Sequence, residues 1–458
     1  MAEVPQTLLG LDVGTSAIKA VLVDLDGARV SGHSVPTPFG QAPDGSTQMT
    51  VEALLAAIRD VLVPLAPWLP GIAGVGVASL GESGGWVAAG GIADVPLLVW
   101  HDPRGQATAD RLVAALGQAE VVRRTGRPAR SWTTLSKIGW LAEQGVRPAG
   151  SWTGVAGLVV WSLTGAVAQE PSLAATSGAY DPARGRYDDD LLAVAGVEVQ
   201  WAPVLPGGTS IGTVTQAGAA RTGLPLGVPV TIAGHDHPVG VVGAGARRGM
   251  VTDSMGTGEP LIVAWDAARP FPVLDGLPGH LTLTCWPGQP SLMLLWEHLR
   301  PGLGLHNLAE LLRLPRAQLE LRAQDRPESR PLDAAVLLGL ESGLLGADDL
   351  RPHLQDDPGQ TWADALDGYA QLAAQAEVRL RGLTGADQPT LLTGGGTRSP
   401  RWVRAKRDRA THGLVVADDP DSVARGAALL AGVAASCWSE DLPPAAGVPA
   451  PDPVEAPS

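Results

Sequence analysis

One plan occurs twice along this chain: an apolar run, a turn that contains Gly-Thr, and a second apolar run. The first copy spans residues 7–24 around Gly14-Thr15, and the second spans residues 250–265 around Gly256-Thr257-Gly258. Short apolar runs separated by turn residues are typical of paired, buried strands. The repetition therefore indicates an internal duplication of one architecture, with a domain boundary between the two copies.

The remaining pattern alternates between strands and helices. Apolar residues at helical spacing predict helices over 51–62, with Thr50 as N-cap, and over 362–380. A short apolar strand over 228–233 leads into Gly234-His235-Asp236-His237, and small residues over 421–434 predict another helix. Such alternation predicts α/β layers with ligands bound at the ends of strands.

A chain of 458 residues is long enough for two domains. We expect an N-terminal domain over residues 1–243 and a C-terminal domain over 244–440. The last segment, 441–458, is rich in Pro and Ala and is expected to be a disordered tail.

Composition narrows the possible partners. With 45% apolar and 17% charged residues the chain is expected to be folded and soluble, and its net charge of −14 argues against a broad surface for nucleic acid or anionic membrane. A small anionic ligand such as a nucleotide needs only a local electropositive nest. Two cysteines provide neither a disulfide framework nor a zinc pattern, and we find no signal peptide or membrane span. We therefore expect a cytoplasmic protein.

Both Gly-Thr turns have the residues of a phosphate-binding loop. In Asp12-Val13-Gly14-Thr15-Ser16-Ala17-Ile18-Lys19, backbone N–H groups and a hydroxyl can point at phosphate oxygens, while Asp12 can hold Mg²⁺ through water. The alternative is an ordinary hairpin whose Asp caps the turn. Gly256-Thr257-Gly258 is a common turn by itself, but two such hairpins could grip a triphosphate from opposite sides.

Two further segments have candidate chemistry. Asp236, at the end of a buried strand, is a candidate general base. It could instead bind a metal together with His235 and His237, or cap the following helix. Consecutive glycines at Gly394-Gly395-Gly396 would let a flat ligand lie against the backbone, although an isolated glycine run is more often a loop.

In this order and spacing, the segments resemble the FGGY family of carbohydrate kinases, which includes glycerol kinase, xylulokinase, ribulokinase and gluconokinase. The resemblance covers roughly residues 8–434. It also includes four further stretches: Trp100-His101-Asp102-Pro103-Arg104, Trp161-Ser162-Leu163-Thr164-Gly165, Gly223-Leu224-Pro225-Leu226-Gly227-Val228-Pro229-Val230 and Gly426-Ala427-Ala428-Leu429-Leu430-Ala431.

The resemblance implies an α/β, two-domain actin/hexokinase-like (ribonuclease H-like) fold with an interdomain catalytic cleft. It implies in-line transfer of the γ-phosphoryl group of ATP, with Mg²⁺, to a hydroxyl of a small sugar or polyol, and Asp236 as the base. Asp12 and Asp236 would organise Mg²⁺, largely through water. The ATP phosphates would bind at Asp12, Gly14, Thr15, Ser16, Lys19, Gly256, Thr257 and Gly258, and the adenosine at Gly394, Gly395, Gly396 and Arg398.

Substrate residues transfer less directly from the resemblance. The candidates are Glu82, Trp100, Asp102, Arg104, Trp132, Asp236 and His237. Core packing is an equal alternative for Trp132. The chain departs from the family pattern at Thr47-Gln48-Met49, at His237, where the family has Gln or Asn, and over 408–413. These departures leave the sugar unassigned.

Two other functions fit the same fold. An actin-like or chaperone-like ATPase would hydrolyse ATP without a sugar, and a non-catalytic protein would bind sugar or nucleotide without turnover. Release of ADP that depends on a sugar distinguishes the kinase from both. The sequence does not fix the oligomeric state; a homodimer is one assembly that it allows.

Overall fold

The computed structural model describes residues 5–265, 281–296, 299–326, 330–353, 356–417, 419 and 421–438. These residues form two compact units. The first contains residues 5–245, 281–293 and 421–438, and the second contains the described residues of 246–265 and 294–420. The first segment ends close to the predicted limit at residue 243, whereas helix α16 (Ser422–Ala434), which falls in the predicted second domain, belongs to the first unit. The domain limits stay a prediction, and the predicted tail at 441–458 lies outside the described residues.

The first unit is organised around a six-stranded sheet. Its strands run in the order β14 (Gly212–Thr213), β15 (Pro229–His235), β6 (Ile72–Ser79), β1 (Thr7–Val13), β2 (Ala17–Val23) and β3 (Arg29–Pro36). Strands β1 and β2 form the predicted antiparallel hairpin, while β15, β6 and β1 are parallel. The carboxyl ends of these three parallel strands therefore meet at one edge of the sheet.

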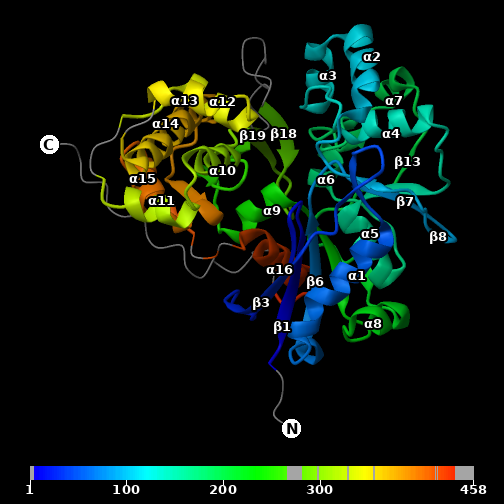
Figure 1. Ribbon diagram of the computed structural model, residues 1–458. Coiled ribbons are helices and arrows are strands. Elements are labelled where there is room, and N and C mark those ends of the chain that lie inside the picture. The colour runs from blue at the N-terminus through cyan, green and yellow to red at the C-terminus, as the bar shows by residue number, and fades with distance from the viewer. Residues whose placement is uncertain are drawn as a thin grey trace. The chain divides into compact units, whose positions relative to one another are not determined.

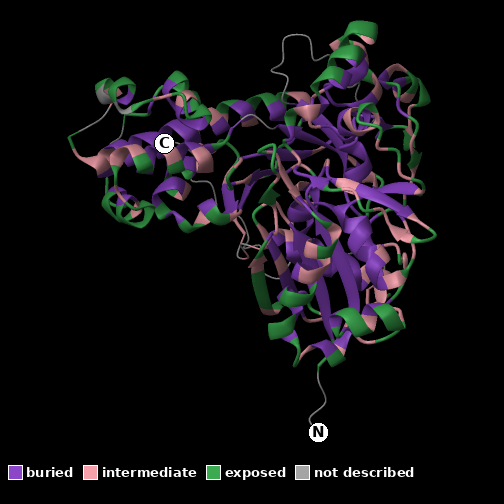
Figure 2. Ribbon diagram, turned by 45° about the vertical axis from the view of Figure 1, so that its right-hand side comes forward, coloured by how far each residue is buried: buried purple, intermediate pink, exposed green. Residues whose placement is uncertain are grey.

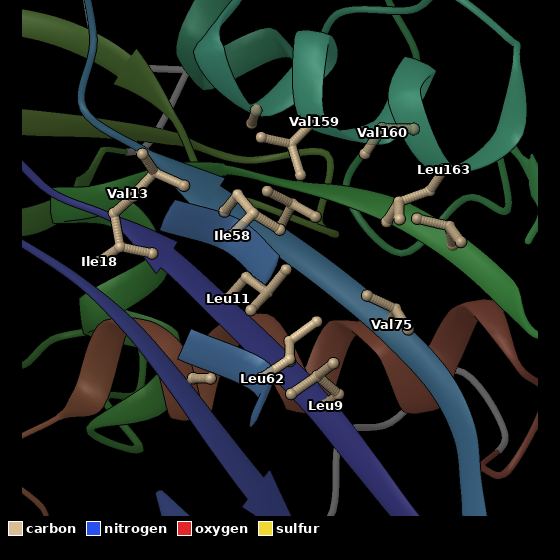
Figure 3. Packing of buried hydrophobic residues seen from close by; sticks show 14 of the residues in the cluster. Leu9, Leu11, Val13, Ile18, Ile58, Leu62, Val75, Val159, Val160 and Leu163 are labelled. Carbon is tan, nitrogen blue, oxygen red and sulfur yellow. The ribbon is translucent and has the colours of Figure 1, made fainter. Parts of the chain in front are cut away.

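Helices cover both faces of this sheet (Figure 1). On one face, Leu9 and Leu11 of β1 pack with residues of α1 (Val51–Leu62) and α5 (Val155–Thr164), as Figure 3 shows. On the other face, Leu8 packs with alanines of α16. Leu8 and Leu9 lie on opposite faces because successive side chains of a strand alternate between the two faces of the sheet. Figure 2 shows these central strands as buried.

Helix α16 approaches the sheet so closely that side chains are excluded. A Cβ on Gly10 of β1 would lie 1.8 Å from the carbonyl oxygen of Ala424, and one on Gly76 of β6 would lie 2.0 Å from that of Ala427. Glycines in the strands and alanines in the helix thus make one close-packed layer. As predicted, α1 begins after Thr50, whose hydroxyl accepts a hydrogen bond from the Ala53 N–H.

Further elements surround the sheet of the first unit. A second sheet has the order β13 (Gln200–Trp201), β10 (Ser151–Gly154), β7 (Gly84–Ala88) and β8 (Gly91–Ile92). The other helices are α2 (Gln106–Leu116), α3 (Gln118–Thr125), α4 (Thr134–Glu143), α6 (Pro171–Ala175), α7 (Asp189–Ala195), α8 (Gln216–Thr222) and α9 (Asp236–Gly243).

The second unit repeats the hairpin-plus-parallel-strand plan. Strand β16 (Val251–Ser254) is antiparallel to β17 (Leu261–Trp265) and parallel to β20 (Thr390–Thr393), which is parallel to β21 (Leu414–Val416). Its core contains residues of α10 (Pro301–Leu312), α11 (Arg316–Ala323), α12 (Ala334–Ser342), α14 (Pro358–Thr384) and α15 (Pro400–Arg407). The predicted helix at 362–380 is the middle of α14. Within the described part of the chain, no helix is long and apolar enough to span a membrane.

Candidate active site

Sheet register places three predicted site segments at one edge of the first unit's sheet. Val13 at the end of β1 is paired with Ser79 at the end of β6, and Ser79 is paired with His235 at the end of β15. Asp12, the segment that contains Glu82, and Asp236 therefore lie beside these three strand ends. Their proximity follows from parallel pairing, which brings strand ends together from distant parts of the chain.

Asp12 is a buried carboxylate with unused hydrogen-bonding capacity. Its Oδ1 is buried and has no hydrogen-bond partner among the described residues, while its Oδ2 lies 4.0 Å from Nζ of Lys19, the residue opposite it on β2. Burial raises the pKa of Asp12 to about 7; the Lys19 charge opposes this rise, and the charges of Asp236 and Asp421 add to it. A buried, unpartnered carboxylate oxygen is a suitable ligand for a hard cation such as Mg²⁺.

The turn after Asp12 presents polar groups at its surface. Gly14 and Thr15 are half-buried and Ser16 is exposed. The turn is fixed by a hydrogen bond from the Gly14 N–H to the Ala17 carbonyl at 3.1 Å and by the Thr37 hydroxyl, which donates to the Gly14 carbonyl at 2.7 Å. The exposed Ser16 and the half-buried Thr15 of this fixed turn can therefore contact a ligand.

Asp421 completes this charged group, and the sequence interpretation missed it. The residue lies immediately before α16, and its carboxylate is 3.3 Å from Lys19 Nζ and 2.8 Å from Arg29 Nη1. Burial opposes ionisation of Asp421, but the hydrogen bond from Arg29 and the nearby Lys19 charge lower its pKa overall. The small-residue pattern of α16 predicted the helix but gave no indication that the preceding Asp would meet Lys19.

Asp236 begins helix α9 and is fixed through one oxygen. Its Oδ1 accepts a hydrogen bond from the His237 N–H at 2.7 Å and lies 3.1 Å from Nε2 of His235. The N-cap position of α9 is occupied by His235, and among the described residues no side chain makes a cap hydrogen bond there. The Asp236 side chain is 22% exposed, so it is accessible to a ligand.

The same residues provide a possible set of metal ligands, as the sequence alternative proposed. One ligand atom from each of His235, Asp236 and His237 lies within 4.8 Å of the others. Burial lowers the pKa of His235 to about 3, so its imidazole is neutral. However, its Nδ1 is buried without a hydrogen-bond partner in the described chain, whereas metal-bound imidazoles usually donate their second N–H to an acceptor. The three possible metal ligands are therefore present, but the acceptor that would orient the His235 ring is missing among the described residues.

Glu82 is held in a strained conformation by its neighbours. Its φ is +59°, a left-handed value that is uncommon for a residue with a side chain. Its N–H donates to the Thr176 hydroxyl at 3.1 Å, and its carbonyl accepts from the Thr134 hydroxyl at 3.3 Å. Its carboxylate accepts a hydrogen bond from Arg127 Nη1 at 2.9 Å, and both side chains are at least nine-tenths buried. Local strain held by several contacts is typical of functional sites.

The sequence interpretation also missed Arg127 as the partner of Glu82. The two residues are 45 positions apart, and no spacing rule connects them. The only available signal was physical: a carboxylate that is buried beside a strand end requires a cation or several hydrogen-bond donors.

Asp102 and Arg104 form an ion pair, and Arg104 Nη1 also lies 3.5 Å from Oδ2 of Asp44. The Arg104 guanidinium donates to both oxygens of Asp102 at 2.7–3.0 Å, and its backbone N–H donates to Asp102 at 2.9 Å. The guanidinium also stacks over the ring of Trp140, with its carbon 4.4 Å from the ring centre. These contacts involve both carboxylate oxygens of Asp102, so the pair stabilises the local backbone. Asp102 and Arg104 stay candidate substrate contacts.

The two candidate tryptophans are half-buried. Trp100 lies edge-on to His101, with 4.9 Å between ring centres, and the Arg130 guanidinium lies 5.9 Å from the ring centre of Trp132. Neither ring is fully enclosed, so core packing accounts for only part of each. Lys137 lies on α4, five residues after Trp132. Its side chain is buried, and its Nζ donates to the Val99 carbonyl at 3.0 Å. Burial lowers the Lys137 pKa to about 8, although the charges of Glu82 and Asp102 act to raise it.

In the second unit the two glycine segments lie against each other. Gly256-Thr257-Gly258 is an exposed turn between β16 and β17, closed by a hydrogen bond from the Gly256 N–H to the Gly258 carbonyl at 3.0 Å. The N–H of Gly396 donates to the carbonyl of Met255, the residue before this turn, at 2.8 Å. Gly394 has φ +88°, and a Cβ there would lie 2.9 Å from the same carbonyl, so the segment requires glycine.

Arg398 follows these glycines as an exposed side chain. Its Nη2 lies 3.1 Å from the position that a Cβ on Gly395 would occupy. The guanidinium therefore lies over the glycine run, where it could contact a ligand bound there.

Comparison with known proteins shows which family this chain belongs to. Residues 7–243, just over half of the chain, match the N-terminal domain of the FGGY family of carbohydrate kinases. The L-fuculokinase of Escherichia coli O157:H7 is 27% identical over 443 residues, which cover 93% of this chain and 91% of that protein.

Solved structures share the fold. The xylulose kinase from Rhodospirillum rubrum superposes with a TM-score of 0.79 at 24% identity, covering 94% of this chain and 91% of that one. The Plasmodium falciparum glycerol kinase with ADP superposes with a TM-score of 0.77 at 14% identity, covering 95% and 90%. The two-domain α/β fold predicted from the sequence is therefore confirmed.

Proposed function

Because the chain belongs to the FGGY family of carbohydrate kinases, we propose that Asp236 is the general base in transfer of a phosphoryl group from ATP to a ketose hydroxyl. Membership confirms the prediction of a carbohydrate kinase. The observation that supports Asp236 most strongly is its attachment through a single oxygen. The His237 N–H and His235 Nε2 both contact Oδ1. Oδ2 is therefore the oxygen that we assign to the proton of the attacking hydroxyl.

Asp12 and its neighbours would bind Mg²⁺ and the phosphate groups of ATP and so neutralise their charge. The unpartnered Oδ1 of Asp12 fits Mg²⁺, and that ion, when bound with ATP, would neutralise charge on the phosphate oxygens. Lys19 and the turn Gly14–Thr15–Ser16 would contact phosphate oxygens through an ammonium group, backbone N–H groups and hydroxyls. Phosphoryl transfer depends mainly on such positioning and charge stabilisation.

We assign nucleotide contacts in the second unit to its two glycine segments. The exposed turn at 256–258 would receive phosphates, and the run at 394–396 would accept the flat face of adenosine, with Arg398 beside it. Two facts support this assignment: the Gly396 N–H donates to the carbonyl of Met255, the residue before the turn, and the glycines themselves carry no side chain that would keep a ligand from the backbone.

For the sugar, we propose a ketose and place L-fuculose first. The support is similarity to the L-fuculokinase over 93% of the chain. Glu82 and Arg127 would contact sugar hydroxyls as acceptor and donor. Because the two side chains form a buried pair of opposite charges, they suit a neutral polyhydroxylated ligand better than a sugar acid.

A coupled assay of ADP release tests this function. The panel contains L-fuculose, D-xylulose, D-ribulose, glycerol, gluconate and a sample without sugar, each with ATP and Mg²⁺. We expect ADP release to depend on a ketose. Equal release without any sugar would identify an ATPase, and no release under any condition would identify a binding protein; either result would contradict the proposal.

A further inference from the structure

We propose that the short helix α6 (Pro171–Ala175) is the positioning element of the site, because its two ends hold the Asp236 segment and the Glu82 segment respectively. The proposal rests on the proposed function, which makes these two side chains the base and the sugar acceptor. Every side chain on α6 except that of Pro171 is buried, so the helix is anchored in the first unit.

The first end of α6 holds the strand that leads into Asp236. Glu170 is the N-cap, and its Oε2 accepts hydrogen bonds from the N–H groups of Ser172 at 2.7 Å and Leu173 at 3.2 Å. The Ser172 hydroxyl also donates to Glu170 Oε2. This donation orients the hydroxyl so that its oxygen can accept a hydrogen bond from the His235 N–H at 2.9 Å. Glu170 and Ser172 thus fix the residue that precedes Asp236.

Contact at this end leaves no room for a side chain. A Cβ on Gly234 would lie 2.7 Å from the Ser172 hydroxyl and 2.9 Å from Glu170 Oε2, and Gly234 has φ +137°. The backbone therefore rests directly on the Glu170–Ser172 pair. A carboxyl group that is fully buried in this place also has a raised pKa, about 8, because burial disfavours its charge.

The second end of α6 holds the Glu82 segment. Thr176, the C-cap, donates its hydroxyl hydrogen to the Leu173 carbonyl at 2.8 Å and accepts the Glu82 N–H at 3.1 Å. A Cβ on the neighbouring Gly81 would lie 2.7 Å from Cγ2 of Thr176 and 3.1 Å from Nε2 of His235. The Glu82 segment is therefore packed between the end of α6 and the histidine next to the base.

These contacts give α6 a function that differs at its two ends. Displacement of a reacting group by about 1 Å can reduce turnover by about 100-fold. Loss of the Ser172 contact should mainly disturb the base, whereas loss of the Thr176 contact should mainly disturb sugar binding. Variants at the Ser172 end of α6 are thus expected to change mainly kcat, and variants at the Thr176 end are expected to change mainly the sugar KM.

Hydrogen–deuterium exchange tests the positioning directly and needs no substrate. In Ser172→Ala, exchange should become at least about 10-fold faster in the segment that contains His235, and in Thr176→Val in the segment that contains Glu82. The matched controls are Ser162→Ala and Thr222→Val, since both remove a buried hydroxyl that donates to a backbone carbonyl in the same unit. If Ser172→Ala does not fold, Ser172→Cys replaces it, because a thiol is a weaker acceptor of similar shape.

Kinetics with L-fuculose, or with the best sugar of the panel, give the second test. Ser172→Ala should lower kcat by about 10-fold or more while the sugar KM changes by less than about threefold, and Thr176→Val should do the reverse. Unchanged exchange in both segments, or parallel changes in kcat and KM in both variants, would overturn the proposal. If the wild type releases no ADP with any sugar, the proposed function fails, and the exchange measurement alone decides whether α6 holds the two segments.

Discussion

At the scale of single residues, four carboxyl groups of the first unit lie in unlike surroundings. Asp12 and Glu170 are buried, with pKa values raised to about 7 and about 8, whereas Asp236 is partly exposed and Glu82 is paired with Arg127. Unlike surroundings let identical groups take different tasks. We therefore assign them to Mg²⁺ binding, positioning, proton removal and sugar binding respectively.

The first prediction concerns Glu82. In Glu82→Gln, a charged hydrogen-bond acceptor is lost, at a cost of about 1.5–3 kcal/mol, so the sugar KM should rise by about 10–100-fold while the KM for ATP is retained. Steady-state kinetics measure both constants. Glu120→Gln is the control, because it removes the same charge from a more exposed carboxylate, which pairs with Arg123 and Arg124. An unchanged sugar KM would make Glu82 a purely structural partner of Arg127.

The second prediction concerns the pH dependence of stability through Glu170. Burial raises its folded-state pKa from an ordinary 4.5 to about 8. The stabilisation from the neutral carboxyl is therefore complete below pH 4.5 and is lost as the pH rises through about 8. Since Gln does not ionise, the variant lacks this loss. The melting temperature of Glu170→Gln minus that of the wild type should therefore increase between pH 6 and pH 9. A difference that stays constant over this range would show that the Glu170 pKa is not raised.

Three of the residues that the sequence predicted lie at or just after strand ends. Asp12 and Asp236 were predicted because strand ends are ligand-binding positions, and Glu82 was predicted from the family resemblance; sheet register brings the three segments to one edge. Arg127 and Asp421 were not predicted. Their positions depend on contacts with residues far away in the sequence, for which local patterns contain no signal.

At the scale of elements, the repeated strand–turn–strand plan was predictable and the packing on it was not. Both hairpins form, and each pairs with a parallel strand. The alanine pattern of α16 predicted a helix, but not the sheet that it covers. The glycines of β1 and β6 that admit α16 were visible in the sequence, but their partners are identified only when the fold brings them together.

The third prediction tests the exposed turn of the second unit. Thr257→Val keeps the shape of the side chain and removes a hydroxyl donor, so the KM for ATP should rise by about 10–100-fold, in line with the loss of one hydrogen bond to a charged group, about 1.5–3 kcal/mol. Sugar binding, measured by calorimetry without nucleotide, should remain as in the wild type. Wild-type constants for ATP would contradict the assignment of this turn to phosphate.

The fourth prediction concerns the buried ion group beneath that turn. Lys406 contacts both Asp253, at 2.5 Å, and Glu259, and all three side chains are buried. Burial and the Asp253 charge raise the Glu259 pKa well above its ordinary value. Lys406→Met would leave two acids facing each other without a cation and should destabilise the protein by about 3–5 kcal/mol.

Urea unfolding measures this loss. Arg59→Gln, which removes an exposed ion pair with Asp60, is the control and should change stability by less than about 1 kcal/mol. A loss of comparable size in Lys406→Met and Arg59→Gln would show that the buried group does not stabilise the second unit.

At the scale of the whole molecule, the ordered motifs were sufficient for the family, the fold and the kinase class, but not for the sugar. The class depends on a few residue types at fixed positions after strands, which a sequence displays. Sugar selection depends on hydrogen-bond partners placed to within a fraction of an ångström. We propose that in this protein the placement involves Arg127 and the two ends of α6, which are separated in sequence from Glu82 and Asp236 and contact their segments only in the folded chain.

Turnover of Asp236→Asn, with sugar binding measured on the same protein, tests the central claim most directly. Asn is nearly isosteric with Asp and can still accept the His237 N–H, so folding and sugar affinity should persist while kcat falls by about 10²–10⁴-fold. His235→Ala and His237→Ala are measured alongside, because a metal bound by all three residues would make each of these variants equally inactive. An Asp236→Asn protein that phosphorylates its sugar at close to the wild-type rate would contradict the account.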